Sequence, residues 1–267
     1  MRARLMWVAL IVLAAPLAPS AAAAIDIVAC RQVVPAGQVG RLLRDLDCRA
    51  QSSFPFSAEG VRLEGGATLD LNGFAIRGDG SGVGVMCAPG RRRAPCRVKG
   101  PGEISGFWAG VNGGGCRLVM KRVLVRGNTN GVYAPLDCDL RGDHLDVEDN
   151  LGDGIWVARL RGRTLAVRGN GGRGVVTSRI AARGLAATDN ALEGVRQSTT
   201  RGRFGRLVDS TVIGNDAAGA GLDIAAAGRL RLRGVRCRRS ARLRYPAVVD
   251  SIDDVPEIVG SFGCIDD

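Results

Sequence analysis

The 267-residue sequence has few of the residues that base-stacking sites and zinc centres require. Aromatic residues make up only 4% of the chain, His144 is the one histidine, and no two cysteines show a CxxC spacing. Base-stacking surfaces are built from aromatic rings, and zinc centres from clustered cysteine and histidine ligands. Both kinds of site are therefore disfavoured. After residue 24 the sequence also lacks an apolar run long enough to cross a bilayer as a helix.

Lysine is nearly missing as well, because 35 of the 37 basic residues are arginines and only Lys99 and Lys121 are lysines. The formal net charge is +11. This balance favours acidic partners such as uronic-acid polymers, lipopolysaccharide, anionic membranes or nucleic acid. The alternative is a solvated basic surface that serves solubility. The 39 glycines have no strict period of three, which excludes collagen, and they disfavour a helix bundle.

Residues 1–24 have the pattern of a secretory signal peptide, with Arg2 and Arg4 before an apolar run and small residues at Ala22–Ala24. This pattern predicts cleavage near Ala24 and a secreted or periplasmic product. Lipoprotein processing at Cys30 is the competing interpretation, because residues 27–30 resemble a lipoprotein box. An oxidising compartment predicts that the eight cysteines form disulfides.

An internal repeat dominates the chain. Asparagines recur at intervals of 20 to 25 residues, each preceded by alternating apolar residues and followed by a glycine: Asn128, Asn150, Asn170, Asn190 and Asn215. Alternation at period two predicts short strands. Strands of three or four residues bury a face only when one coil stacks on the next. The sequence therefore predicts an all-β right-handed parallel β-helix solenoid with about 20–25 residues per coil.

The repeat also sets domain bounds, turn conformations and disulfides. We expect an N-terminal cap at residues 25–60, the β-helix at 61–240 and a capping tail at 241–267. The asparagines are predicted to take the left-handed backbone position of the turn and to hydrogen-bond along the stack. Cys116 and Cys138 share a column, which predicts one disulfide. The other predicted pairs are local or tie down the tail: Cys30–Cys48, Cys87–Cys96 and Cys237–Cys264.

Three segments carry a family resemblance. The sequences TLDLNG at residues 68–73, IRG at 76–78 and GPGEISG at 100–106 resemble secreted right-handed β-helix repeat proteins. These include the pectate-lyase-like superfamily and the NosD-type periplasmic proteins. The resemblance implies the fold over most of the chain after residue 24. It does not imply an activity, because the same scaffold carries lyases, hydrolases, epimerases, adhesins and non-enzymes.

An acidic coil between residues 137 and 153 suggests one catalytic hypothesis. Polyuronate lyases of this fold use calcium and a basic residue to remove a sugar proton. Asp146 and Asp149 could supply calcium ligands. Arg122, Arg126 or Arg168 could act as base or charge clamp, and His144 as general acid or base. The alternative is a set of surface ion ladders, since arginines and acids alternate in register. His144 shows no orienting carboxylate in the sequence. The interpretation as ion ladders is favoured, so we assign no cofactor, and calcium belongs only to the lyase alternative.

Arginines give the second functional hypothesis. Arg159 and Arg179 share one column, and Arg163 and Arg183 share another. Regularly spaced guanidinium groups suit carboxylates along a linear polymer. The sequence therefore favours a non-enzymatic module that binds acidic glycans of the cell envelope, with a polysaccharide lyase as the alternative. Secretion and scarce aromatics argue against nucleic acid as the partner.

Overall fold

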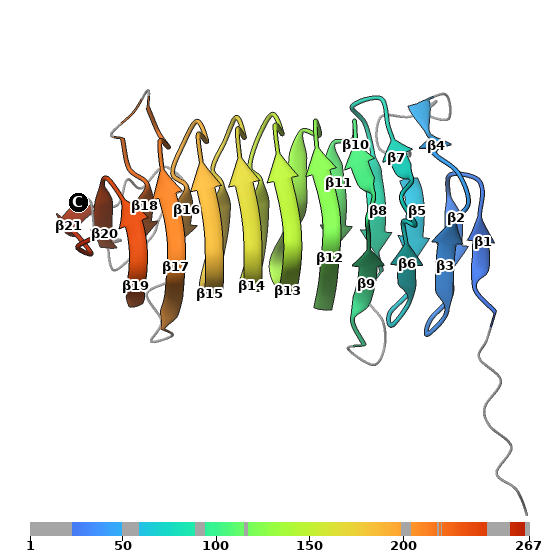
Figure 1. The fold of residues 1–267 in the computed structure, drawn as a ribbon, viewed down its shortest axis with the longest axis horizontal. Helices are drawn as coiled ribbons and strands as arrows, with labels where there is room; N and C mark the ends of the chain where they lie inside the picture. The colour runs from blue at the N-terminus through green and yellow to red at the C-terminus, as the bar shows by residue number, and fades with distance from the viewer. Residues whose placement is uncertain are drawn as a thin grey trace, which may run out of the picture.

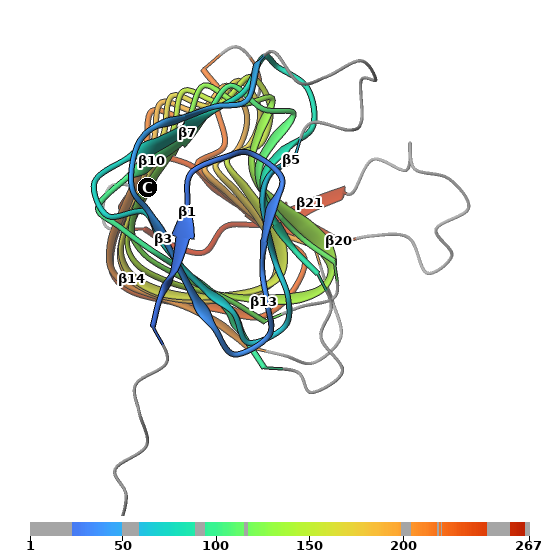
Figure 2. The same ribbon diagram turned by 90° about the vertical axis from the view of Figure 1, so that its right-hand side faces the viewer.

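The computed structural model describes residues 23–49, 59–88, 94–114, 117–198, 204–217, 219, 221–244 and 257–264. In this part of the chain all regular elements are strands, which pair almost entirely in parallel and stack along one long axis (Figure 1). Seen end-on, the coils lie behind one another around a common interior (Figure 2). This arrangement confirms the predicted right-handed parallel β-helix.

Each coil contributes to three parallel sheets, which are continuous where a long strand bends around a corner. The first sheet contains β2 (Gln32–Val34), β5 (Glu59–Leu63), β8 (Val83–Cys87), β11 (Ala109–Gly113), the starts of β13 (Asn130–Glu148), β14 (Ile155–Arg168) and β15 (Val175–Thr188), then β16 (Val195–Gln197), β18 (Ile224–Ala226) and β20 (Ser240–Arg244).

The second sheet follows in each coil and carries the side chains that matter most below. It contains β1 (Ile25–Ile27), β3 (Val39–Leu42), β6 (Thr68–Asp70), β9 (Cys96–Lys99), the start of β12 (Arg117–Arg126), residues 139–143, 159–163 and 179–183 of β13 to β15, and the starts of β17 (Gly205–Ile213) and β19 (Leu230–Cys237).

The third sheet closes each coil. It contains β4 (Leu46–Asp47), β7 (Ala75–Arg77), β10 (Glu103–Ser105) and the last residues of β12, β13, β14, β15, β17 and β19. Alternate residues of all three sheets point inward and form columns, such as the buried Leu118, Leu140, Leu160 and Ile180. One continuous core results, because no single coil could bury its own apolar side.

A buried asparagine ladder runs along the turn between the third and first sheets. The five predicted asparagines are at most 4% exposed. The side-chain Nδ2 of Asn150 donates to Oδ1 of Asn170 at 2.9 Å, and Asn170 and Asn190 each donate to the next amide at 2.8 Å. The predicted hydrogen bonding along the stack is therefore confirmed.

The predicted left-handed conformation of these asparagines is wrong. Positive φ angles occur at the preceding residues: Gly127, Asp149, Gly169, Asp189 and Gly214. The physical reason is the direction of the side chain. The preceding residue turns the chain, so that the asparagine amide points inward and its Oδ1 accepts both N–H groups of the asparagine in the coil before it, as Asn170 does for Asn150.

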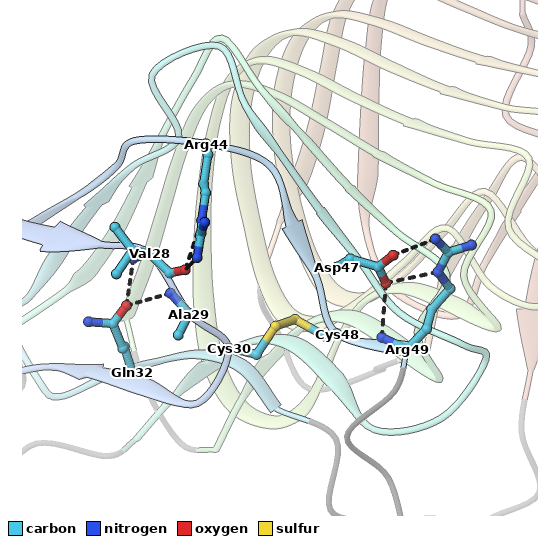
Figure 3. Close-up of a disulfide and its surroundings, with 8 residues drawn as sticks. All are labelled: Val28, Ala29, Cys30, Gln32, Arg44, Asp47, Cys48 and Arg49. Atoms are coloured by element: carbon cyan, nitrogen blue, oxygen red, sulfur yellow. Dashed lines mark hydrogen bonds and ion pairs between the residues drawn. A yellow bond between two sulfur atoms is a disulfide. The ribbon is translucent and has the colours of Figure 1, made fainter.

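Three of the predicted disulfides are present. Cα atoms lie 5.8 Å apart in Cys30–Cys48, 6.1 Å in Cys87–Cys96 and 5.4 Å in Cys237–Cys264. Figure 3 shows the first of these bonds beside Arg49, which holds the pKa of Asp47 at about 2 by hydrogen bonding. The predicted Cys116–Cys138 bond involves Cys116, which lies outside the described residues.

Strand pairing continues into the described parts of both predicted caps. Strands β1 and β3 already pair in parallel within residues 25–60, so the predicted N-terminal cap is itself built of solenoid strands. At the other end β20 still pairs in parallel with β18, and β21 (Glu257–Gly260) then adds to β20 in antiparallel fashion. The Cys237–Cys264 disulfide ties this final segment to the last coil.

Candidate functional site

The outer surface of the second sheet carries a column of arginines with no acidic member. Strand register places residues 97, 119, 141, 161, 181, 206 and 231 beside one another in successive coils. Five of these seven are exposed arginines, which we call the arginine column: Arg97, Arg141, Arg161, Arg206 and Arg231. Inward-facing residues alternate with these arginines along the strands, among them the buried Leu118, Leu140 and Leu160. Because the core holds these leucines inward, the arginines point outward.

The arginine columns predicted from the sequence flank this central column on both sides. Arg159 lies beside Arg179, and Arg163 beside Arg183, as the repeat indicated. Three of the four hold a carboxylate: Arg159 pairs with Asp139, Arg163 with Asp143 at 2.8 Å and Arg183 with Asp209 at 2.9 Å. By contrast, among the residues that the structure describes, no carboxylate lies within ion-pair distance of the arginine column.

Two hollows lie along this surface. The first has a volume of about 160 Å³ and is lined by four arginines: Arg117, Arg141, Arg159 and Arg161. Asp139 lies at the same hollow and orients Arg159. The second, of about 280 Å³, includes Arg183 and Arg206. Guanidinium groups at adjacent coils thus converge on concave surface, an arrangement that suits the bidentate binding of carboxylate, sulfate or phosphate groups.

Asp143 is the centre of a small charged network next to the arginine column. Its carboxylate accepts hydrogen bonds from Arg163 at 2.8 and 3.1 Å, and Lys121 lies 3.7 Å away. Hydrogen bonds from Arg163 and then from His144 hold the pKa of Asp143 well below its usual range. Asp143 is therefore charged at neutral pH and fixes Arg163 in place.

His144 has an orienting carboxylate that the sequence pattern did not reveal. Its Nδ1 lies 2.9 Å from Oδ1 of Asp143. The sequence offered one signal, namely that Asp143 directly precedes His144. Adjacent residues of an ordinary strand point to opposite sides. His144, however, has a positive φ of 50° and turns its side chain toward Asp143. Residues 122, 144, 164 and 209 all have positive φ, which marks the corner between the second and third sheets.

A larger hollow, of about 560 Å³, lies at this same corner. It brings together His144, Asp146 and Arg122, with Glu103 and Asp45 from earlier coils. Asp45 is committed to Arg77, which lowers its pKa by hydrogen bonding, and Glu103 pairs with Arg126 at 3.0 Å. Three sequence-predicted catalytic candidates, Arg122, His144 and Asp146, thus share one concavity.

The other catalytic candidates belong to ion ladders on the third sheet. Arg126 and Arg168 stand in one column with Glu148, and Nε of Arg168 lies 2.7 Å from the Glu148 carboxylate. Hydrogen bonds to Glu103 and Glu148 raise the pKa values of Arg126 and Arg168, so both guanidinium groups are held in their charged form. The structure therefore supports ion ladders for these two residues.

The proposed calcium ligands separate along the third sheet. Asp146 is exposed at the large hollow, whereas Asp149 takes the left-handed position of the turn at the far end of the strand. Over the described ranges, no group of three or more His, Cys, Asp and Glu side chains could hold a metal ion. Asp146 and Asp149 therefore do not belong to one such group among the described residues.

Comparisons with known proteins give the fold class. No family model matches the chain, and no curated protein matches it. Among solved structures, the A-module of the Azotobacter vinelandii mannuronan C-5 epimerase AlgE4 is similar, with a TM-score of 0.55 and 18% identity, covering 74% of this chain and 68% of that chain. The enzymatically active domain of bacteriophage CBA120 tailspike protein 2 has a TM-score of 0.44 and 10% identity over 78% of this chain and 38% of that one.

Together with the strand pairing, the first of these similarities shows the class of fold: a parallel β-helix. At this identity the similarity concerns the fold alone. No described helix of the chain is long and apolar enough to span a membrane.

Proposed function

We propose that this protein is a secreted or periplasmic β-helix module that binds acidic polysaccharides of the cell envelope without turning them over. One observation carries the proposal: five exposed arginines form a column along the solenoid with no carboxylate partner in the described residues. Strands of adjacent coils are spaced about 4.8 Å apart. A linear polyanion laid along the column would therefore meet a guanidinium group at most coils.

Acidic residues beside the arginine column limit the unpaired positive charge to the column itself. Asp139, Asp143 and Asp209 neutralise and fix the flanking arginines. The polymer is thus directed to the central column, where the guanidinium groups have no competing carboxylate among the described residues. Charge-assisted hydrogen bonds of this kind contribute about 1.5–3 kcal/mol each when formed. On an exposed surface they are screened by salt, so binding depends on ionic strength.

Two further features support the proposal. Three disulfides are typical of proteins that mature in an oxidising compartment, in keeping with the predicted signal peptide. The fold is also found in a protein whose name describes action on mannuronan, an acidic polysaccharide.

The test incubates the chain from Ile25 with polygalacturonate, alginate and a neutral dextran. Affinity electrophoresis measures retardation, and ultraviolet absorbance of the same samples measures unsaturated product. We expect retardation by at least one acidic polymer, weakened by added salt, with no change in absorbance. Migration unaffected by every acidic polymer would overturn the proposal.

A polysaccharide lyase is the second candidate, and one observation favours it. The hollow at the sheet corner gathers His144, Asp146 and Arg122, which are residue types that can move a proton and clamp a carboxylate. Rising absorbance that is abolished by His144→Ala or Asp146→Asn would replace the binding proposal with this one.

A further inference from the structure

Three aromatic side chains form a ladder on the outer surface of the first sheet, which we call the aromatic ladder: Trp108, Tyr133 and Trp156. The ring of Tyr133 lies 5.1 Å from that of Trp108 and 5.5 Å from that of Trp156, both in edge-to-face contact. The two indoles remain 39% and 37% exposed. In a chain with so few aromatic residues, three successive coils thus present aromatic rings to solvent.

The strand column that contains Tyr133 and Trp156 is uncharged. Strand register places Met86, Asn112, Tyr133, Trp156 and Val176 in one column across five coils. The column ends at Arg62 on one side and Arg196 on the other. Each of these arginines is already paired, with Glu59 at 3.0 Å and with Glu193 at 2.9 Å. A strongly basic protein therefore keeps one stripe of its surface neutral.

Amide groups flank the rings. Asn112 lies beside Tyr133 in register, and Asn130 lies at the start of the same strand, where its side-chain Nδ2 approaches the Trp108 carbonyl only loosely, at 3.5 Å. Both asparagines are half-buried. The stripe therefore combines apolar ring surface with amide donors and acceptors that can bind hydroxyl groups.

From these contacts we infer that the aromatic ladder binds the uncharged part of a polysaccharide. Pyranose rings present apolar C–H faces that stack on aromatic rings, and their hydroxyls hydrogen-bond to amides. The rings recur once per coil along the solenoid axis, which matches a linear polymer. The neutral stripe would gain nothing from an anionic ligand, so this surface differs in chemistry from the arginine column.

The exposed area argues against a second copy of the chain as occupant. An aromatic side chain buries roughly 150–250 Å² in total. Three rings that are less than half exposed therefore offer on the order of 300 Å² at most. A stable protein interface buries about 800 Å² on each partner. A glycan segment is accordingly a better fit than a dimer.

Tryptophan fluorescence provides a direct test. Tryptophans occur only at positions 7, 108 and 156, so the chain from Ile25 reports solely on the aromatic ladder. The probes are neutral oligomers of β-1,4-linked glucose, mannose and N-acetylglucosamine. We expect a saturable change in emission with at least one oligomer, unaffected by salt. Trp156→Ala should weaken that binding about tenfold or more, measured by calorimetry, because stacking area and ring order are both lost.

Matched variants separate this inference from the proposed function. Phe204→Ala removes an aromatic ring that is 42% exposed but is in cation–π contact with Arg229 and Arg231, and it should leave neutral-oligomer binding intact. Arg141→Ala with Arg161→Ala should also leave it intact while weakening polyuronate binding.

Three results would overturn the inference: no binding of any neutral oligomer, equal binding by wild type and Trp156→Ala, or self-association in ultracentrifugation that Trp156→Ala abolishes. Because polyuronate binding is measured separately on the same variants, failure here leaves the arginine column untouched.

Discussion

The asparagine ladder and the arginine column each occupy one position of the same repeat, yet the ladder is buried and uncharged whereas the column is exposed and charged. Each ladder asparagine is buried and hydrogen-bonded, and the last one, Asn215, donates to Asp223 at 3.0 Å. The arginine column is exposed, and its neighbours hold the available carboxylates. Repetition alone therefore does not distinguish structural from binding residues. The two kinds of residue are distinguished by whether their hydrogen bonds and charges are satisfied within the protein.

The largest effect is expected from breaking the asparagine ladder. Asn170→Ala removes the acceptor of two Asn150 N–H groups and the donor to Asn190. Each buried group left unsatisfied costs about 1–3 kcal/mol. We expect a loss of about 3–5 kcal/mol in the free energy of unfolding, measured in urea.

The matched change in the arginine column is Arg161→Ala. It removes an exposed side chain without a carboxylate partner in the described residues, so its effect on the free energy of unfolding should stay within about 0.5 kcal/mol. Equal destabilisation by the two variants would contradict the distinction between the two columns.

A smaller effect of opposite sign is expected at Gln197. This side chain is fully buried and inward-facing, yet its Nε2 and Oε1 have no hydrogen-bond partner among the described residues. Val157 holds the equivalent position two coils earlier. Because an orphaned buried amide costs about 1–3 kcal/mol, Gln197→Val should raise the midpoint of thermal unfolding.

The control for Gln197→Val is Thr177→Val in the coil between. The Thr177 hydroxyl lies within donating distance of the Ala158 and Arg179 carbonyls, at 3.1 and 3.0 Å, and accepts a hydrogen bond from the Arg179 N–H. Its removal should lower the midpoint or leave it unchanged. Stabilisation by both variants would show that any apolar residue helps, independent of hydrogen bonding.

The smallest effect is expected from Asp143, whose depressed pKa gives a pH dependence. A carboxyl group with a folded pKa below its unfolded value, near 3.9, stabilises the fold above about pH 4 and loses that stabilisation as the pH falls. Asp143→Asn should therefore flatten the decline in thermal midpoint below pH 4. Arg163→Ala should do the same, because hydrogen bonding by Arg163 is the main cause of the shift.

The double variant completes the cycle. If Asp143 and Arg163 act through one another, combining the two changes adds little to either alone. If the thermal midpoint of both single variants declines below pH 4 as steeply as that of the wild type, the proposed stabilisation by this pair is contradicted.

Much of the fold was predictable because residues at the same position of a solenoid repeat pair in adjacent coils, so the repeat interval gives the strand register. The asparagine interval alone places Leu118, Leu140 and Leu160 in one column, and all three are buried in the core. It also pairs Arg159 with Arg179 and Arg163 with Arg183. The two local disulfides were predicted from the proximity of their cysteines along the chain. These features depend on spacing along the chain, which a sequence displays directly.

The site was less predictable because it depends on partners rather than spacing. Arg141 and Arg161 are twenty residues apart and could have been found by the same register, but only the structure shows that acids neutralise the flanking columns instead. The contact of His144 with Asp143 depends on a positive φ that histidine rarely adopts. The aromatic ladder was hidden because Trp108 reaches Tyr133 from a turn outside the strand repeat.

The most direct test compares two pairs of arginines that differ in whether a carboxylate holds them. Polygalacturonate is titrated into wild type, into Arg141→Ala with Arg161→Ala, and into Arg163→Ala with Arg183→Ala, at low and high salt. We predict that loss of the unpaired arginines weakens binding at least about tenfold and reduces its salt dependence, because two charge-assisted contacts disappear. Loss of the paired arginines should have a clearly smaller effect. Equal losses from both pairs, or binding unchanged without Arg141 and Arg161, would contradict the assignment of the arginine column as the binding surface.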